Sequence, residues 1–391
     1  MPEIDLALFG SAQVTVDGHA PLTFPTQKTF ALLAYLAVER GRPHRREELA
    51  GLLWPDLPEV TARSNLRKTL ERLRVALGEI DGVPGAIPLL RVDAQAVQFN
   101  PEAVHGLDVV EFEDLLRGCE RHRHHSLDAC PACAQRLTQA LALYRGDFLV
   151  GFSIKNSAPF EEWALIQREH HRRQAVSALD TLVARNERLG EHEAARRWLV
   201  RQLELEPWRE ESHRRLMTVL TLVGQRSQAL AQYATCRRVL REELDVDPAP
   251  ETVALAERIT YGPELTESPQ ILERRARRLA LPVPPTPLVG RTTELAAMNE
   301  LLGDPARRLV TLLGLGGAGK THLALAAAPS LEGLFLQGAT FVPLAGLSTA
   351  DLAPAAILLA LGETPAADSP PAESLVSYLR QRQLLLILDS A

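Results

Sequence analysis

Residues 61–78 read TARSNLRKTLERLRVALG, and this stretch decides the fold at the start of the chain. Its leucines recur three or four positions apart from Leu66 to Leu77, a spacing typical of an amphipathic helix with one buried stripe. The remaining faces carry five basic side chains against the single acid Glu71. The stretch therefore predicts a helix that begins near Pro58, ends at Gly78 and has a basic outer surface.

The segments around this helix predict the rest of one small domain. Short β-like runs at 4–9 and 12–16 open the chain, and apolar side chains at helical spacing predict two helices, around 30–37 and 49–53. Residues 89–92 and 96–99 flank a turn and predict a β-hairpin. Three helices followed by a hairpin form a winged helix-turn-helix, which we expect over residues 1–105.

The third helix is the predicted DNA-binding element. The whole chain has a net charge of −6, so a contact with DNA must come from a local excess of basic residues. In a winged helix-turn-helix this helix enters the major groove. The candidate DNA-binding residues are Arg63, Asn65, Arg67, Lys68 and Arg72. The alternative is that they are ordinary solvated charges on an amphipathic helix.

Residues 106–262 are predicted to be almost wholly helical. Gly190 and Gly224 lie 34 positions apart, as do Ala195 and Ala229, and 34 residues is the tetratricopeptide (TPR) period. Stacked helix pairs of this kind present a concave surface to protein partners. The register slips between Pro207 and Pro248, so a plain helical bundle is the alternative to a TPR-like array.

Two short motifs in this region predict a metal site. Cys119 and His122 form a CxxH pair, and Cys130 and Cys133 form a CxxC pair. Two such pairs supply the tetrahedral nitrogen and sulfur shell of a structural Zn²⁺ site. His124 is an alternative to His122, and the alternatives for the thiols are a redox pair or simple packing. Cys236 is expected in the core.

The last part of the chain predicts a nucleotide site. A Pro-rich linker, 263–287, leads into a partial α/β domain at 288–391, with strands expected at 309–313, 339–344 and 384–388. The loop GLGGAGKT at 314–321 can hold the phosphates of ATP or ADP, with Mg²⁺ on a threonine and a strand-end aspartate. The predicted binding residues are Gly314, Gly316, Gly317, Ala318, Gly319, Lys320, Thr321 and Asp389.

The composition predicts a mainly α, multidomain, cytoplasmic protein. No apolar run approaches the roughly 20 residues that a membrane-spanning helix requires. The N-terminus, MPEID, carries acid where a secretory signal carries base. We therefore expect no membrane partner.

Two stretches resemble a family of bacterial regulators. REELAGLLWPD at 46–56 and LYRGDFL at 143–149 resemble motifs of the AfsR/SARP-type transcriptional activators, which have an OmpR-like winged helix and a bacterial transcriptional activation domain. LVGR at 288–291 and the Glu294-Leu295 pair resemble the start of a STAND-class P-loop NTPase. The resemblance implies promoter binding, recruitment of RNA polymerase and self-association controlled by nucleotide exchange.

The main functional hypothesis is thus a DNA-binding transcriptional activator controlled by ATP or ADP. The alternative is a P-loop signalling ATPase scaffold whose N-terminal helices bind protein partners rather than DNA. Only two residues follow Asp389. We therefore expect the rest of the sheet to belong to a longer protein, where any weak ATPase activity would reside, and nucleotide binding without efficient hydrolysis in this stretch.

Overall fold

The structure is a computed structural model that describes residues 4–16, 20–77, 89–100, 105–123, 127–262, 281–284, 286, 288–304, 306–331, 334–335, 337–363, 370–380 and 382–390. Contacts divide the chain into two units. The first comprises Met1–Gly118 and Arg136–Ala178, and the second comprises Cys119–Gln135 and Leu179–Ala391. This grouping differs from the expected four-part division because the first unit also contains helices that follow residue 105.

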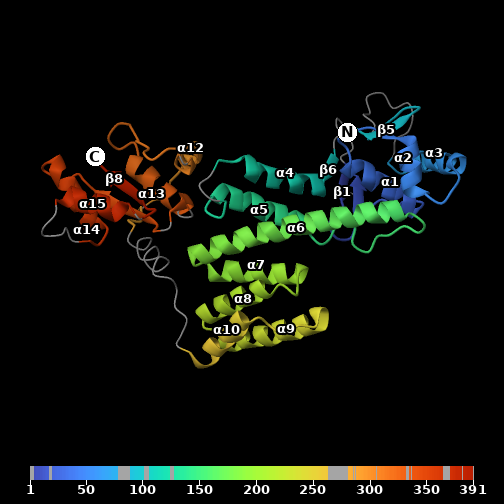
Figure 1. The fold of residues 1–391 in the computed structure, drawn as a ribbon. Coiled ribbons are helices and arrows are strands. Elements are labelled where there is room, and N and C mark those ends of the chain that lie inside the picture. Colours follow the sequence, from blue (N-terminus) through green and yellow to red (C-terminus); the bar gives the residue numbers. More distant parts are fainter. Residues whose placement is uncertain are drawn as a thin grey trace. The chain divides into compact units, whose positions relative to one another are not determined.

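The first unit begins with the predicted winged helix-turn-helix (Figure 1). Its elements are β1 (Ile4–Ala7), β2 (Gln13–Val16), α1 (Gln27–Val38), β3 (His44–Arg45), α2 (Arg46–Leu53), α3 (Glu59–Ala76), β4 (Leu90–Val92), β5 (Ala96–Phe99) and β6 (His105–Leu107). The apolar stripe of α3 is buried from Leu66 to Leu73, where it packs with α1 and α2. The predicted helix end at Gly78 lies outside the described residues.

Two strand pairings in this unit were not predicted. β4 and β5 form the expected antiparallel hairpin, and β3 adds a third strand beside β5. β1 pairs antiparallel with β2 and also parallel with β6, in the order β2-β1-β6. Strands β3 and β6 are only two and three residues long, too short for their sequences to show a period of two.

The stretch 143–149 joins the N-terminal strands to α6 (Ala158–Leu189). The backbone N–H of Leu149 donates to Leu8 at 2.9 Å, and the N–H of Gly10 donates to Asp147 at 3.0 Å. A Cβ on Gly146 would lie 3.3 Å from the Cα of Gly10, so the glycine permits this close approach. The stretch LYRGDFL therefore works as a structural connector inside the first unit.

The helical region follows with α4 (Asp108–Arg121), α5 (Pro131–Leu143), α6, α7 (His192–Leu205), α8 (Glu210–Leu222), α9 (Arg226–Leu244) and α10 (Pro250–Tyr261). Gly190 and Gly224 end α6 and α8 in the same way, each with a positive φ. Each following residue donates to a carbonyl five positions earlier, with N···O distances of 2.8 Å. Ala195 and Ala229 are fully buried. The 34-residue repeat thus corresponds to two equivalent helix connections.

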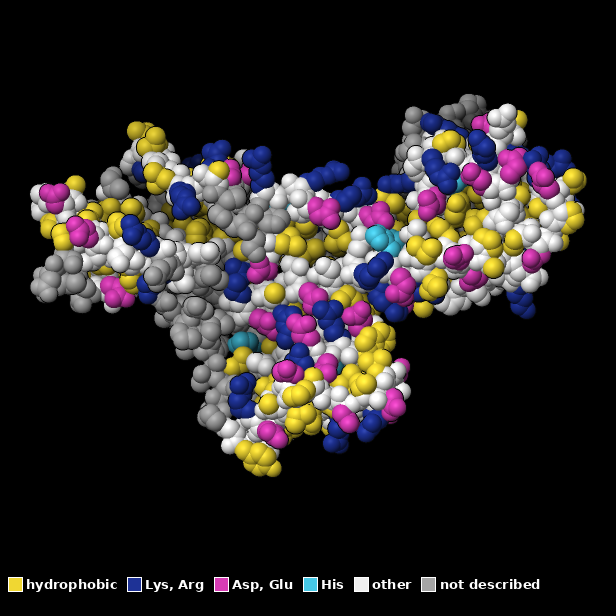
Figure 2. Space-filling model, in the orientation of Figure 1, with side chains coloured by type: hydrophobic (Ala, Val, Ile, Leu, Met, Phe, Trp, Pro, Cys, Tyr) yellow, Lys and Arg dark blue, Asp and Glu magenta, His cyan; other side chains and the backbone are white. Residues whose placement is uncertain are grey.

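Charges on α7 to α10 are mixed, in contrast to those on α3. Figure 2 shows basic and acidic side chains interspersed over this region. Many of them pair within one helix, as Arg201 does with Glu204 at 2.8 Å and Arg196 with Glu193 at 2.9 Å. These exposed ion pairs are solvated, and their opposite charges leave little net charge that could attract a nucleic acid.

The C-terminal part contains α12 (Thr292–Gly303), α13 (Lys320–Leu331), β7 (Ala339–Pro343), η2 (Ala350–Leu352), α14 (Ala353–Ala360), α15 (Pro371–Leu379) and β8 (Leu385–Asp389). β7 and β8 are parallel neighbours, as predicted. The strand predicted at 309–313 is wrong: these residues pair with no strand of the described ranges, and the side chains of Leu309 and Leu313 are 82% and 89% exposed. A strand of a β-sheet needs a partner strand for its hydrogen bonds, so an apolar run alone does not make one.

The predicted linker, 263–287, falls mostly outside the described ranges. Within those ranges, no helix combines the length and the apolar character that a membrane span requires.

Candidate DNA interface, nucleotide loop and metal cluster

The outer face of α3 presents basic side chains over several turns. Leu66, Leu70 and Leu73 hold the opposite face in the core, so the helix cannot rotate its charges inward. Arg67, Lys68 and Arg72 are exposed, whereas Asn65 is half-buried. At about 100° per residue, the nine positions from Arg63 to Arg72 span about two and a half turns. Arg63 and Arg72 therefore point to opposite sides of α3, and Arg67 and Lys68 point in directions between them.

Arg63 differs from the other candidates because acidic neighbours hold it. Its Nη2 lies 2.6 Å from Glu47 Oε1 of α2 and 2.7 Å from Glu59 Oε1. The two carboxylates offset its charge and orient the guanidinium along the α2–α3 junction. Arg67 and Lys68 are thus better placed than Arg63 to meet a phosphate.

The hairpin adds a basic residue that is not among the predicted DNA-binding residues. Arg91 is exposed on β4, the first strand of the hairpin. The side chain of Arg46 at the start of α2 donates from Nη2 to the Asp93 carbonyl at 2.7 Å and so links α2 to the hairpin turn. Hairpins of this fold approach the DNA backbone. The position of Arg91 in a predicted hairpin was therefore the sequence signal that could have indicated this residue.

The predicted phosphate-binding loop occupies residues 314–321. It leads directly into α13, which begins at Lys320. Gly317 and Gly319 have φ values of +76° and +81°, a region that favours glycine. Lys320 Nζ donates to the carbonyls of Gly314 and Leu315, both at 2.9 Å. The lysine side chain therefore folds back over the loop.

Thr321 and Asp389 come together although 68 positions separate them. The Thr321 hydroxyl donates to Asp389 Oδ1 at 2.6 Å. These are the two side chains expected to hold Mg²⁺, and oxygen donors are the ligands that this ion prefers. The parallel pair β7 and β8 places Asp389 at the end of β8.

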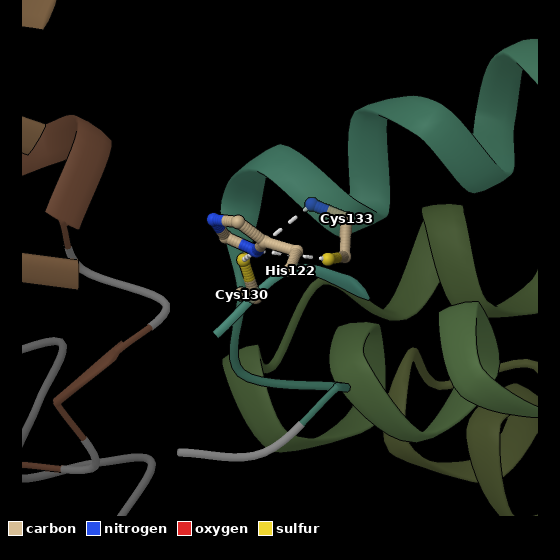
Figure 3. Close-up of side chains that lie close together, drawn as sticks. All are labelled: His122, Cys130 and Cys133. Atoms are coloured by element: carbon tan, nitrogen blue, oxygen red, sulfur yellow. Dashed lines mark hydrogen bonds between the residues drawn. The ribbon is translucent and has the colours of Figure 1, made fainter. Parts of the chain in front are cut away.

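Three of the four predicted metal ligands converge between α4 and α5 (Figure 3). The ligand atoms of His122, Cys130 and Cys133 all lie within 4.8 Å of one another. His122 Nδ1 lies 3.3 Å from Cys133 Sγ and 3.4 Å from Cys130 Sγ. The alternative ligand His124 lies outside the described residues.

Cys119 lies beside this trio without belonging to it. Its thiol is 3.7 Å from the Cys133 carbonyl oxygen. All three cysteines are buried, with at most 3% of each residue exposed. Burial, together with the neighbouring Cys130 and Cys119 thiols, raises the pKa of the Cys133 thiol. The sequence motifs indicated the four residues, but only the structure shows that Nδ1 of His122 faces the sulfurs.

A second group of ligand-type residues, Glu113, His170 and His171, has another explanation. His171 is fully buried, and its Nε2 lies 3.1 Å from Glu113 Oε1. The hydrogen bond from His171 lowers the pKa of Glu113 despite burial. Because Arg117 also lies 3.5 Å from Glu113, this carboxylate has partners within the protein that account for its position.

Comparisons with known proteins cover different shares of the chain. Residues 107–260 match the family model of the bacterial transcriptional activator domain. Regulatory protein AfsR of Streptomyces coelicolor is 29% identical over 408 residues, which cover 98% of this chain and 39% of AfsR. Transcriptional regulatory protein EmbR of Mycobacterium tuberculosis is 36% identical over 75 residues, 19% of each protein.

A solved structure of Mycobacterium tuberculosis EmbR in complex with a low affinity phosphopeptide aligns with a TM-score of 0.49 at 24% identity. The alignment covers 72% of this chain and 71% of that chain. The chain itself spans 39% of the length of AfsR. The matched relatives are the kind of protein that the motifs at 46–56 and 143–149 resemble, and the family model matches the helical region.

Proposed function

We propose that this chain binds promoter DNA through α3 and activates transcription through its helical domain. The observation that carries the proposal is the exposed basic face of α3, which lies in the same chain as a matched bacterial transcriptional activator domain. Arg67 and Lys68 are the central phosphate contacts, and Arg72 on the same helix and Arg91 on the hairpin add further contacts. Asn65 and Arg63 help to shape the helix surface. RNA polymerase is the partner of the activator domain.

The nucleotide loop supplies control in this proposal. Lys320 and the amides at the start of α13 bind the phosphates of ATP or ADP, and Thr321 with Asp389 holds Mg²⁺. The supporting observation is the 2.6 Å contact between Thr321 and Asp389. Nucleotide binding then shifts the protein between a restrained and a self-associated form, which requires different affinities for the nucleotide in the two forms.

A salt titration of DNA binding tests the DNA contact. Duplexes selected from a random pool are titrated with the chain over a range of salt concentrations. Affinity should fall steeply with salt, and the double variant Arg67→Glu, Lys68→Glu should bind more weakly with a slope reduced by about two, roughly one for each lost phosphate contact. Arg238→Glu, an exposed position on α9 paired with Glu242, is the matched control.

The outcome separates this proposal from the scaffold alternative. If the double variant keeps the affinity and the slope of the parent, α3 does not face DNA and the proposal fails. The match to an activator domain favours the regulator, because a signalling scaffold gives no reason for that domain.

A further inference from the structure

We propose that His122, Cys130, Cys133 and Cys119 bind one structural Zn²⁺, and that Arg185 and Arg188 connect this ion to α6. In a tetrahedral site with Zn–S near 2.3 Å and Zn–N near 2.0 Å, a nitrogen and a sulfur ligand lie about 3.5 Å apart. The two distances from His122 Nδ1 to sulfur are 3.3 and 3.4 Å. The trio is therefore spaced close to what a shared zinc ion requires.

The types of ligand atom indicate which metal ion the site binds. Soft thiolates with one imidazole suit Zn²⁺, whereas Mg²⁺ and Ca²⁺ take oxygen ligands. Cys119 is the fourth ligand, because it is the remaining buried thiol beside Cys133. Four protein ligands leave no position for water, so the ion holds the fold and carries out no reaction.

The local backbone positions the sulfur of Cys130. This residue directly precedes α5, and the N–H of Cys133 donates to its sulfur with an N···S distance of 3.5 Å. The two cysteines of the CxxC pair are therefore held close together at the start of α5.

Two arginines of α6 hold the segment that carries Cys130. Arg185 Nη1 donates to the Ala129 carbonyl at 2.9 Å, and Arg188 Nη2 donates to the Asp128 carbonyl at 2.8 Å. Arg188 Nε also lies 3.5 Å from the Asp128 carboxylate. These bonds fasten residues 128–129 to the last turns of α6, just before the connection at Gly190 to α7. Metal occupancy should therefore determine how firmly that end of α6 is held.

Metal analysis tests the site in the whole chain. Protein purified under reducing conditions, without an affinity tag that binds metal, should contain about one zinc per chain by elemental analysis. Cys130→Ser and Cys133→Ser should lose the zinc. Cys236→Ser should keep it, because Cys236 is a buried thiol on α9 that is absent from the cluster.

Cobalt binding to the parent protein tests the metal site without any variant, and one variant then tests the fourth ligand. Co²⁺ added to the metal-stripped parent should give the intense visible absorption of a tetrahedral thiolate complex, and Cys119→Ser should shift that spectrum. A parent protein that holds no zinc and gives no such absorption overturns the metal site. A spectrum unchanged in Cys119→Ser overturns the fourth ligand.

Zinc release tests the role of the arginines as positioning residues. The double variant Arg185→Ala, Arg188→Ala should still bind one zinc but release it to a chelator about tenfold faster, as expected when partners outside the metal shell are lost. Arg196→Ala, which removes an exposed ion pair on α7, should release zinc at the parental rate. Equal release rates in the double variant and the parent would overturn the link to α6.

Discussion

At the scale of single residues, Asp108 joins sequence-distant parts of the first unit. Its carboxylate accepts the N–H groups of Leu8 and Phe9 at 2.9 and 3.0 Å and that of Val109 at 2.8 Å. Arg145 adds a charged contact at 2.8 Å. Asp108 is only 8% exposed, so water cannot replace it as the acceptor for these donors.

Asp108→Ala should therefore destabilise the protein by about 3–5 kcal/mol, because it leaves buried N–H donors and an arginine without their acceptor. Chemical denaturation followed by circular dichroism measures the change. Asp114→Ala removes an exposed pair with Arg117 on the same helix and should change the stability by less than about 0.5 kcal/mol. A similar small effect of both variants would show that Asp108 is not a central acceptor.

At the scale of elements, the start of α13 gives the glycine-rich loop a defined conformation. Two glycines with positive φ shape the loop, and the helix then presents its first N–H groups to the same space. Lys320 supplies the only side-chain cation of the stretch 314–321. Most of the expected affinity for phosphate should thus depend on this one side chain together with the backbone.

Lys320→Ala should weaken the binding of ADP by about 10- to 100-fold, the effect of losing charge-assisted hydrogen bonds to phosphate. Titration of a fluorescent ADP analogue with the chain gives the dissociation constant. Lys155→Ala, at an exposed position remote in sequence, serves as the control. Unchanged affinity in Lys320→Ala would exclude the loop as the phosphate site.

At the scale of the whole molecule, the proposed DNA-binding face and the proposed nucleotide loop belong to different units of the chain. α3 packs on α1 and α2 inside the first unit, and the loop at 314–321 belongs to the second. The core that orients α3 is complete within residues that precede Ala178. The DNA contact should therefore not need the nucleotide part.

A protein shortened to residues 1–262 should bind selected DNA with an affinity within about threefold of the full chain, since distant sites contribute independently. Competition binding at one salt concentration measures both proteins on the same duplex. Loss of DNA binding by the shortened protein would contradict this modular arrangement.

The sequence alone determined the elements whose information is local. The leucine spacing of α3, the hairpin after it, the 34-residue repeat and the loop before α13 all follow from periodicity or from residue types within a few turns. The same reasoning selected the four candidate metal ligands, because CxxH and CxxC spacings are themselves local. It failed at 309–313, where an apolar run predicted a strand but nothing local shows whether a partner strand is present.

Only the tertiary structure decided which distant residues meet. β6 pairs with β1, and Asp108 accepts the N–H groups of Leu8 and Phe9. Thr321 donates a hydrogen bond to Asp389, which lies 68 positions further along the chain. It also showed that Glu47 of α2 holds Arg63 of α3, and that Nδ1 of His122 faces two sulfurs. These contacts depend on how whole elements pack, because a side-chain pattern encodes which face is buried but not which partner covers it.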